Sequence, residues 1–208
     1  MSFEKRFSFI TSWIDVIMKW LSITCNISFE VKGLENIPDK PCVVIANHQS
    51  TWETFYTYKL FKPQVTMLKQ ELLWIPVFGW GLKLLKPIAI NRSKKRQALK
   101  MIMSEAPKAI NNGFWYVAYP EGTRVPVDTH VAFASGSSLI ACGGGFNVLP
   151  VAHNAGYCWP GKRFLKYPGK ITLSIGPVIS SADKDARALT REVELWIRKE
   201  QQTLGSGF

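Results

Sequence analysis

The sequence predicts one α/β domain, with a central mixed β-sheet flanked by helices, preceded by an N-terminal amphipathic helix. From Pro41 onward, short apolar runs typical of strands alternate with helix-like segments. The length of 208 residues suits a single domain with a substantial core, and the 47% hydrophobic content excludes a disordered chain. We therefore expect a helical segment over residues 1–29 and an α/β domain over residues 30–208.

Residues 7–29 have the length of a membrane span, but a helix over them carries a narrow polar stripe. Asp15 and Lys19 lie four residues apart on that stripe and can pair. The wide apolar and aromatic face fits a helix lying in a lipid interface, and fits equally a helix that covers the domain's own core. A span is disfavoured because each central charge costs about 2.5–3.5 kcal/mol in a bilayer. A cleaved signal peptide is disfavoured by the same charges.

The remaining elements follow in order. Strands are predicted from short β-branched or alternating runs at 42–46, 65–68, 87–90, 114–119 and 170–175. Helices are predicted at 52–61, at 93–110 and from Ser181 and Asp183 to Leu204. Residues 72–85 suggest an apolar helix broken by Pro76 and Gly79. Residues 129–161 contain no charged side chain but several glycines, which predicts buried helix, strand and loop.

The net charge of +11 predicts a polyanionic partner, such as nucleic acid, anionic lipid or a phosphorylated substrate. No nucleic-acid-binding motif occurs, so we expect no nucleic acid partner. Four scattered cysteines without a C-x-x-C pair indicate reduced thiols and no structural zinc. Seven cations and no acid lie between Leu72 and Ser104, either as a solvated helix face or as a site for lipid headgroups or a phosphorylated substrate.

The first candidate site is the Asn47–Glu53 segment directly after a strand, where α/β sheets place their ligands. His48 could act as a general base, and Glu53 could stabilise its imidazolium. Side chains five residues apart on one helix diverge by roughly 140°, so His48 must precede the helix while Glu53 lies in its first turn. The alternative is structural: Ser50 and Glu53 form a capping-box pattern. We expect Glu53 to have limited reach to serve both the cap and the histidine.

The second candidate is the turn Tyr119–Arg124, which also follows a strand. Gly122 lets the backbone approach a ligand closely, and Arg124 could bind a phosphate bidentately. An ordinary turn with a solvated arginine is the alternative. His130 and His153 lack ligand-like spacing, which favours a surface or a hydrogen-bonded core position for each.

Taken together, these segments resemble the 1-acyl-sn-glycerol-3-phosphate (lysophosphatidic acid) acyltransferases, particularly the bacterial members, from about Gly33 to Ile179. Four short blocks occur in the family's order. They are Asn47–Glu53, Lys69–Arg92, Pro120–Arg124 and Leu149–Ala152. The sequence departs from the family pattern at three places. Glu53 stands where aspartate is common, Asn91 precedes Arg92 in place of aspartate, and the stretch from Phe133 to Gly136 lacks a lysine after its aromatic residue.

The resemblance implies a glycerol-3-phosphate acyltransferase-like fold that transfers a fatty acyl group to the 2-hydroxyl of lysophosphatidic acid. It implies His48 as general base and Glu53 as its partner. The residues that it links to binding of the acceptor's phosphate and glycerol are Lys69, Arg92, Glu121, Gly122, Thr123 and Arg124.

The expected donor is an acyl thioester, either acyl-CoA or acyl carrier protein, and the apolar segment Leu72–Leu85 is expected to line the acyl path. No metal or bound cofactor is expected. We expect a protein associated with an anionic membrane surface, at the cytoplasmic face of the inner (cell) membrane. The alternatives are a different lysophospholipid acceptor, or a non-catalytic basic module that binds membranes or nucleic acid.

Overall fold

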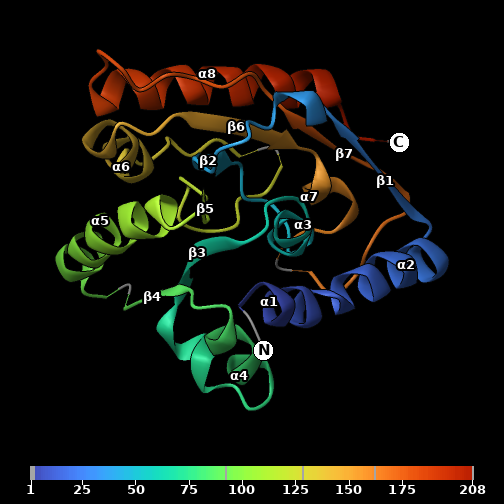
Figure 1. Ribbon diagram of the computed structural model, residues 1–208. Coiled ribbons are helices and arrows are strands. Elements are labelled where there is room, and N and C mark those ends of the chain that lie inside the picture. The colour runs from blue at the N-terminus through green and yellow to red at the C-terminus, as the bar shows by residue number, and fades with distance from the viewer. Residues whose placement is uncertain (1–2, 92, 128, 162, 208) are drawn as a thin grey trace.

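A seven-stranded sheet forms the centre of the molecule in the computed structural model, with helices on both of its faces (Figure 1). The structure describes residues 3–91, 93–127, 129–161 and 163–207. The strands are β1 (Ile27–Lys32), β2 (Val43–Ala46), β3 (Gln64–Lys69), β4 (Ile88–Ile90), β5 (Trp115–Ala118), β6 (Val148–His153) and β7 (Gly169–Ile175). Their spatial order is β1-β7-β6-β2-β5-β3-β4.

The sheet is mixed, as the sequence predicts. Strands β6, β2, β5, β3 and β4 are all parallel to their neighbours within that group. Strand β7 pairs antiparallel with β6, and β1 pairs parallel with β7. The five parallel strands therefore place their carboxyl ends along one edge, which is where open α/β sheets bind ligands.

Helices cover both faces of the sheet. They are α1 (Phe3–Thr11), α2 (Trp13–Cys25), α3 (Trp52–Leu60), α4 (Phe78–Leu84), α5 (Lys95–Asn111), α6 (Gly136–Gly144), α7 (Ala155–Cys158) and α8 (Ala186–Leu204), with 3-10 turns η1 (Leu34–Asn36) and η2 (Gln70–Trp74). Helices α5, α6 and α8 pack on one face, and α1, α2, α3 and α7 contribute to the core on the other (Figure 1).

The alternation of helices and strands agrees with the prediction from the sequence. Some elements begin or end at other residues than predicted, because caps and tertiary contacts set these ends. The N-terminal helix ends at Cys25, because Asn26 adopts a left-handed conformation (φ 52°) and Ile27 begins β1 beside β7. The prediction of helix to residue 29 was therefore wrong. Helix α8 begins at Ala186, later than predicted, because Asp185 caps it by accepting the N–H groups of Arg187 and Ala188. The break predicted within 72–85 is confirmed, and Pro76 lies between η2 and α4.

The two N-terminal helices have one face in the core and another in solvent. Phe7, Ile14, Met18 and Leu21 are buried in the core, so the covering role considered from the sequence is confirmed. A second apolar set remains exposed. It consists of Phe9, Trp13, Val16, Trp20 and Ile23. The described part of the chain contains no helix that is both long and apolar enough to cross a bilayer.

The predicted pairing of Asp15 with Lys19 is not what the structure shows. The Asp15 carboxylate pairs with the ammonium group of Lys59 on α3. Helix α2 packs beside α3, and this brings Lys59 to the polar stripe. The contact ties the N-terminal helices to the helix that follows the first candidate site.

Candidate active site

The carboxyl ends of the parallel strands bring together residues that are far apart in the sequence. His48 follows β2, the turn Tyr119–Arg124 follows β5, and Lys69 ends β3. His153 ends β6, the other neighbour of β2. The two candidate segments therefore meet at one edge of the sheet because their strands are adjacent and parallel.

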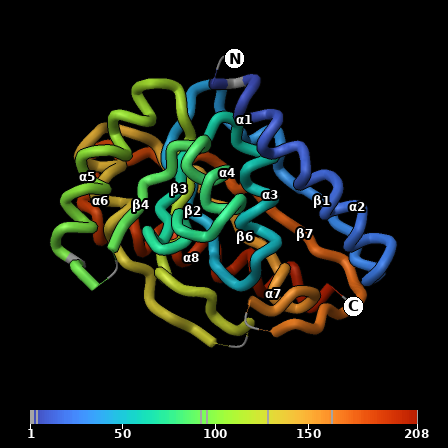
Figure 2. Tube along the Cα trace, turned by 90° about the horizontal axis from the view of Figure 1, so that it is seen from below, coloured from blue at the N-terminus to red at the C-terminus, as the bar shows by residue number. Residues whose placement is uncertain are grey.

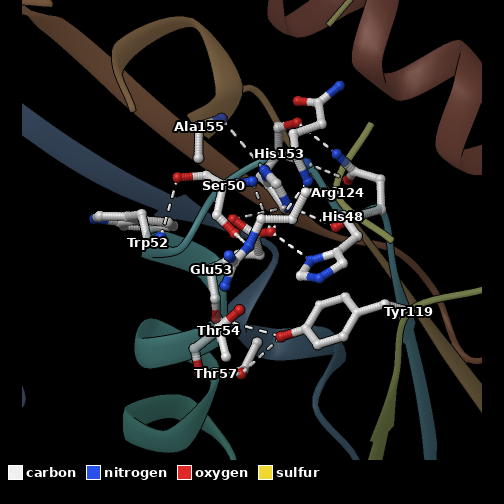
Figure 3. A network of polar contacts seen from close by, with 12 residues as sticks. His48, Ser50, Trp52, Glu53, Thr54, Thr57, Tyr119, Arg124, His153 and Ala155 are labelled. Carbon is white, nitrogen blue, oxygen red and sulfur yellow. Dashed lines mark hydrogen bonds and ion pairs between the residues drawn. The ribbon is translucent and has the colours of Figure 1, made fainter. Parts of the chain in front are cut away.

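His48 and Glu53 form a hydrogen-bonded pair (Figure 3). The distance from His48 Nδ1 to Glu53 Oε1 is 2.8 Å. His48 precedes α3 and Glu53 lies in its first turn, as the helix geometry predicts. An ionised carboxylate accepts only, so Nδ1 carries the proton that is donated to Glu53. The other ring nitrogen, Nε2, is then the unprotonated one and can accept a proton.

The same carboxylate oxygen also caps the turn. Glu53 Oε1 accepts the main-chain N–H groups of Gln49 and Ser50 at 3.1 and 2.9 Å. The expectation that Glu53 has limited reach to serve both the cap and the histidine was wrong, because residues 48–50 converge on this one oxygen. Ser50 Oγ accepts the N–H of Trp52. The catalytic and the structural interpretations of this segment therefore describe the same contacts.

Glu53 is completely buried, and its charge is stabilised locally. Burial by itself raises the pKa of a carboxyl group, but the hydrogen bonds from His48 and from the Ser50 N–H favour the anion, and the pKa of Glu53 lies below its usual value. The group therefore remains an anion beneath the imidazole. The negative charge therefore lies against the ring nitrogen that donates to it.

Tyr119 holds the other side of the imidazole. Its ring stacks on the His48 ring with centroids 4.3 Å apart and planes inclined by 21°. The Tyr119 hydroxyl lies 3.3 Å from Thr57 Oγ1 on α3, and burial raises its pKa, so it stays neutral. The sequence places Tyr119 in the candidate turn but assigns it no role. Stacking against His48 restricts the rotation of the ring.

Glu121 lies behind the His48 main chain. Its Oε1 accepts the His48 N–H at 3.1 Å, while its Oε2 is buried without a hydrogen-bond partner. Burial raises the pKa of this carboxyl, against the opposing effect of the hydrogen bonds. Glu121 lines a small space with Gln49 and Arg198, apart from the cavity at the His48 ring. Its hydrogen bond holds the turn, and Glu121 is not among the residues that line the cavity at His48.

Arg124 and the residues before it lie beside His48. The Arg124 Nε–H donates to the Ser50 carbonyl at 2.8 Å, which joins the second candidate segment to the first. Gly122 has a φ of 70°, a conformation that glycine adopts without a steric penalty. Gly122, Thr123 and Arg124 all line the cavity at His48, as does Lys69, whose Nζ lies 3.9 Å from Glu71 Oε1. Arg92 lies outside the described residues.

The cavity at the His48 ring has a volume of about 420 Å³. His48 and the Gly122–Arg124 turn form its polar part. Its apolar part comes from α2, β3, η2, α4 and the residue after α4, and includes Ile14, Leu68, Leu72, Phe78, Leu82 and Leu85. An apolar chamber that also borders an imidazole suits a ligand with a hydrocarbon chain and one reactive polar group.

His153 is the second histidine of the region, and it is fully buried (Figure 3). Its Nε2 bonds the Asn47 carbonyl at 2.7 Å, and its Nδ1 accepts the Ala155 N–H at 3.2 Å. The prediction of a core histidine with its hydrogen bonds made is therefore confirmed. The Asn47 side chain in turn bonds both main-chain groups of His153. Sequence reasoning missed this pairing, because the two residues are 106 positions apart.

Among the described residues, no group of three or more histidine, cysteine or acidic side chains is arranged to hold a metal ion.

Comparisons with known proteins identify the family of the chain. The Acyltransferase family model matches residues 28–154. A 1-acyl-sn-glycerol-3-phosphate acyltransferase of Pseudomonas aeruginosa is 42% identical over 201 residues, which cover 95% of this chain and 78% of the relative. A protein of the same name from Saccharomyces cerevisiae is 30% identical over 149 residues, covering 65% of this chain and 48% of the relative.

A solved structure shows the same fold. The crystal structure of the 1-acyl-sn-glycerophosphate acyltransferase PlsC from Thermotoga maritima matches with a TM-score of 0.82 and 26% sequence identity, over 97% of this chain and 80% of that chain. The solved structure, the family model and the bacterial relative each match most of this sequence, and all three indicate the same family. The chain belongs to the Acyltransferase family and, within it, to the 1-acyl-sn-glycerol-3-phosphate acyltransferases.

Proposed function

We propose that this protein transfers a fatty acyl group from a thioester to the 2-hydroxyl of lysophosphatidic acid, giving phosphatidic acid for phospholipid synthesis. The observation that carries the proposal is the His48–Glu53 pair at the polar part of an apolar cavity. The names of the Pseudomonas and Thermotoga relatives support the same acceptor. The reaction as proposed uses no metal or bound cofactor.

The proposed mechanism begins with proton transfer to His48. Nε2 takes the proton of the acceptor hydroxyl as that oxygen bonds to the thioester carbonyl carbon, and the Glu53 anion stabilises the imidazolium. The N–H groups of Thr123 and Arg124, two residues that line the cavity, stabilise the oxyanion, whereas the Gly122 N–H already donates to the Tyr119 carbonyl. The C–S bond then breaks, and the leaving thiolate receives the proton from the imidazolium. The stacked Tyr119 keeps the ring aligned through both transfers.

The acceptor's phosphate is assigned to cations at the cavity. Arg124 is fixed by Ser50 and lines the chamber, and Lys69 lies at its edge. The role of Arg92 is carried over from the family pattern alone. Glu121 is assigned to holding the His48 main chain. For Arg124→Ala we expect the KM for lysophosphatidic acid to rise by about tenfold or more, with a smaller fall in kcat.

The test of the proposed reaction is an acceptor panel. Purified protein with an acyl-CoA and lysophosphatidic acid should form phosphatidic acid. Lysophosphatidylcholine and lysophosphatidylethanolamine, whose phosphates carry a further headgroup, should be acylated at least about tenfold more slowly, because those headgroups compete for the space beside Arg124. Equal rates for all three acceptors would contradict the acceptor assignment, and the absence of acyl transfer to any of them would contradict the proposed function.

We also propose that the exposed apolar face of α1 and α2 rests on an anionic bilayer, at the cytoplasmic face of the cell membrane. Val16 and Trp20 are 67% and 66% exposed, although both are apolar. A second exposed apolar set runs from the end of η2 through α4, and α4 is visible on the same side as α1 and α2 in Figure 2. It consists of Trp74, Ile75, Val77, Phe78, Trp80 and Leu84. The exposed Lys83 of α4 adds a cation suited to anionic headgroups.

Liposome flotation tests this placement. The triple variant Val16→Ser, Trp20→Ser, Ile23→Ser removes exposed apolar side chains and leaves the buried face of α2 intact. We expect it to lose most of its binding to vesicles containing phosphatidylglycerol. The matched control is Leu195→Ser, which changes an exposed leucine of α8 on the other face of the sheet and should bind like the wild type. Unchanged flotation of the triple variant would contradict the proposed contact.

A further inference from the structure

A second cavity, of about 310 Å³, adjoins the one at the His48 ring. Arg124 and Gly161 line both cavities, so they form the partition between them. A Cβ atom on Gly161 would lie 2.4 Å from Arg124 Cδ, which shows how closely this backbone packs against the arginine. The Gly161 N–H also bonds the Gln49 carbonyl at 3.0 Å. The second cavity is therefore anchored to the same turn that carries His48.

The lining of the second cavity combines cations with an unused acceptor. Arg124 and Arg163 supply two guanidinium groups, which are the preferred partners of phosphate. Gln49 also lines this cavity, and it is only 8% exposed. Its Oε1 has no hydrogen-bond partner. A Cβ on Gly156 would lie 3.1 Å from that oxygen, so the oxygen borders the glycine wall of the cavity. A buried acceptor without a partner favours a ligand that brings an N–H or O–H group.

The two substrates of the proposed reaction differ in the polar groups that they could present to the second cavity. Lysophosphatidic acid carries a phosphate but no amide, and in the proposed reaction its hydroxyl is the group that reacts at His48. The 4′-phosphopantetheine arm, which bears the acyl thioester in both acyl-CoA and acyl carrier protein, carries a phosphate and two amide N–H groups. We propose that the second cavity binds the 4′-phosphopantetheine arm of the acyl donor, with its phosphate at Arg163 and an amide N–H at Gln49 Oε1. This inference rests on the proposed acyltransferase function.

The arrangement gives each part of the donor its own space. The acyl chain occupies the apolar cavity, the thioester carbonyl lies next to His48, and the arm passes Arg124 into the second cavity. When the acceptor oxygen bonds to the carbonyl carbon, the C–S bond breaks and its electron pair stays on sulfur. The thiolate takes the proton from the His48 imidazolium, and the free thiol leaves along the second cavity. The first cavity then retains the product and the acceptor's phosphate.

The kinetic test uses Arg163→Ala, because this exposed side chain can be removed without disturbing the core. We expect the KM for acyl-CoA and for acyl carrier protein each to rise by about tenfold. The KM for lysophosphatidic acid should stay within about twofold of wild type. The control Arg191→Ala removes an exposed arginine from α8 and should change none of these values. Gln49→Leu should raise the donor KM as well, by a smaller factor.

Three kinetic outcomes would overturn the proposal. A rise confined to the KM for lysophosphatidic acid would assign the second cavity to the acceptor. A rise for acyl-CoA alone would assign it to the nucleotide of CoA and not to the shared arm. Unchanged constants for Arg163→Ala would show that the donor does not bind there.

A binding measurement separates this proposal from the proposed reaction. CoA and free 4′-phosphopantetheine are titrated into His48→Ala protein by calorimetry, so no turnover is needed. We expect both to bind, and the double variant His48→Ala, Arg163→Ala to bind each about tenfold more weakly. Normal turnover by the wild type together with equal binding by the two variants would refute the donor site alone. A failure of the wild type to acylate any acceptor would refute the reaction instead.

Discussion

Two histidines lie on opposite sides of one buried carboxylate, and their surroundings differ (Figure 3). His48 Nδ1 lies 2.8 Å from Glu53 Oε1, and His153 Nε2 lies 3.9 Å from Glu53 Oε2. Both residues belong to the carboxyl ends of adjacent parallel strands. The local fold therefore presents two imidazoles of similar position, and the difference between them comes from the other atoms that each ring contacts.

His153 has a partner at each ring nitrogen, and burial lowers its pKa against the attraction of Glu53. It stays neutral and has no nitrogen to offer a substrate. His48 bonds Glu53 through Nδ1, and its ring borders the cavity. The number of hydrogen bonds already made thus separates a candidate base from a structural residue. Four predictions test the roles of the two histidines and of the Glu53 carboxylate between them.

The largest expected effect is that of His48→Ala. Removing the general base should lower kcat/KM by about 10²–10⁴-fold. The melting temperature should fall as well, because the buried Glu53 carboxylate loses its ring partner. Steady-state kinetics with lysophosphatidic acid and acyl-CoA measure the first effect, and calorimetry measures the second. Turnover equal to that of the wild type would remove His48 from the mechanism.

Glu53→Gln should have a smaller effect on the reaction. The amide oxygen can still accept from His48 Nδ1 and from the turn, so the ring keeps its tautomer while the negative charge is lost. We expect kcat/KM to fall by about tenfold to a hundredfold, in line with the strength of one charged hydrogen bond. A loss as large as that of His48→Ala would mean that Glu53 does more than stabilise the imidazolium.

His153→Leu should act on stability and not on chemistry. The change leaves the Asn47 carbonyl and the Ala155 N–H without their ring partners, which should lower the free energy of unfolding by about 2–4 kcal/mol. The kcat/KM of the folded fraction should fall by less than about tenfold. Urea denaturation measures the stability. The control is His130→Leu at an exposed histidine, which should stay within about 0.5 kcal/mol of wild type.

The smallest effect is a pH dependence of stability. The pKa of His153 is lowered from its ordinary value of 6.5, so below that pH the unfolded chain binds a proton that the folded protein excludes. The free energy of unfolding should therefore fall as the pH drops from 6.5, by up to about 1.4 kcal/mol per pH unit. Glu53 has a lowered pKa and acts in the same direction nearer its ordinary 4.5, whereas the raised pKa of Glu121 acts oppositely.

Comparison of wild type with His153→Leu isolates the contribution of His153. Urea denaturation between pH 7.5 and pH 5 should give a steeper loss for the wild type, so the two proteins should approach each other in stability as the pH falls. Parallel curves over this range would show that His153 is not held neutral by the fold.

The sequence contains enough information for the order of elements and for the edge at which the site forms. The run 42–46 is apolar with β-branched residues at its centre, the run 114–119 is mostly aromatic, and each is followed directly by a polar motif. Each motif could therefore be placed at the carboxyl end of a strand, whereas the adjacency of β2 and β5, which brings His48 and Arg124 together, is seen only in the structure. The helix angle further required His48 to precede the helix, and the structure agrees.

Other features depend on backbone paths that no local pattern encodes. The convergence of three donors on Glu53 Oε1 follows from how residues 48–50 turn. The position of Glu121 behind the His48 main chain depends on how the loop after β5 packs. Asp15 pairs with Lys59 because two helices 44 residues apart in sequence lie side by side. In each case the sequence spacing allows several partners, and a tertiary contact determines which one is used.

The N-terminal helices supply three side chains to the chamber at His48: Thr11, Trp13 and Ile14. Under the proposed function, this segment is therefore more than a membrane contact. Replacing it with an unrelated membrane-binding peptide would restore the contact with a vesicle but remove three side chains that line the proposed space for the acyl chain. Shortening or exchanging this region is therefore expected to alter the chain-length preference of the proposed reaction.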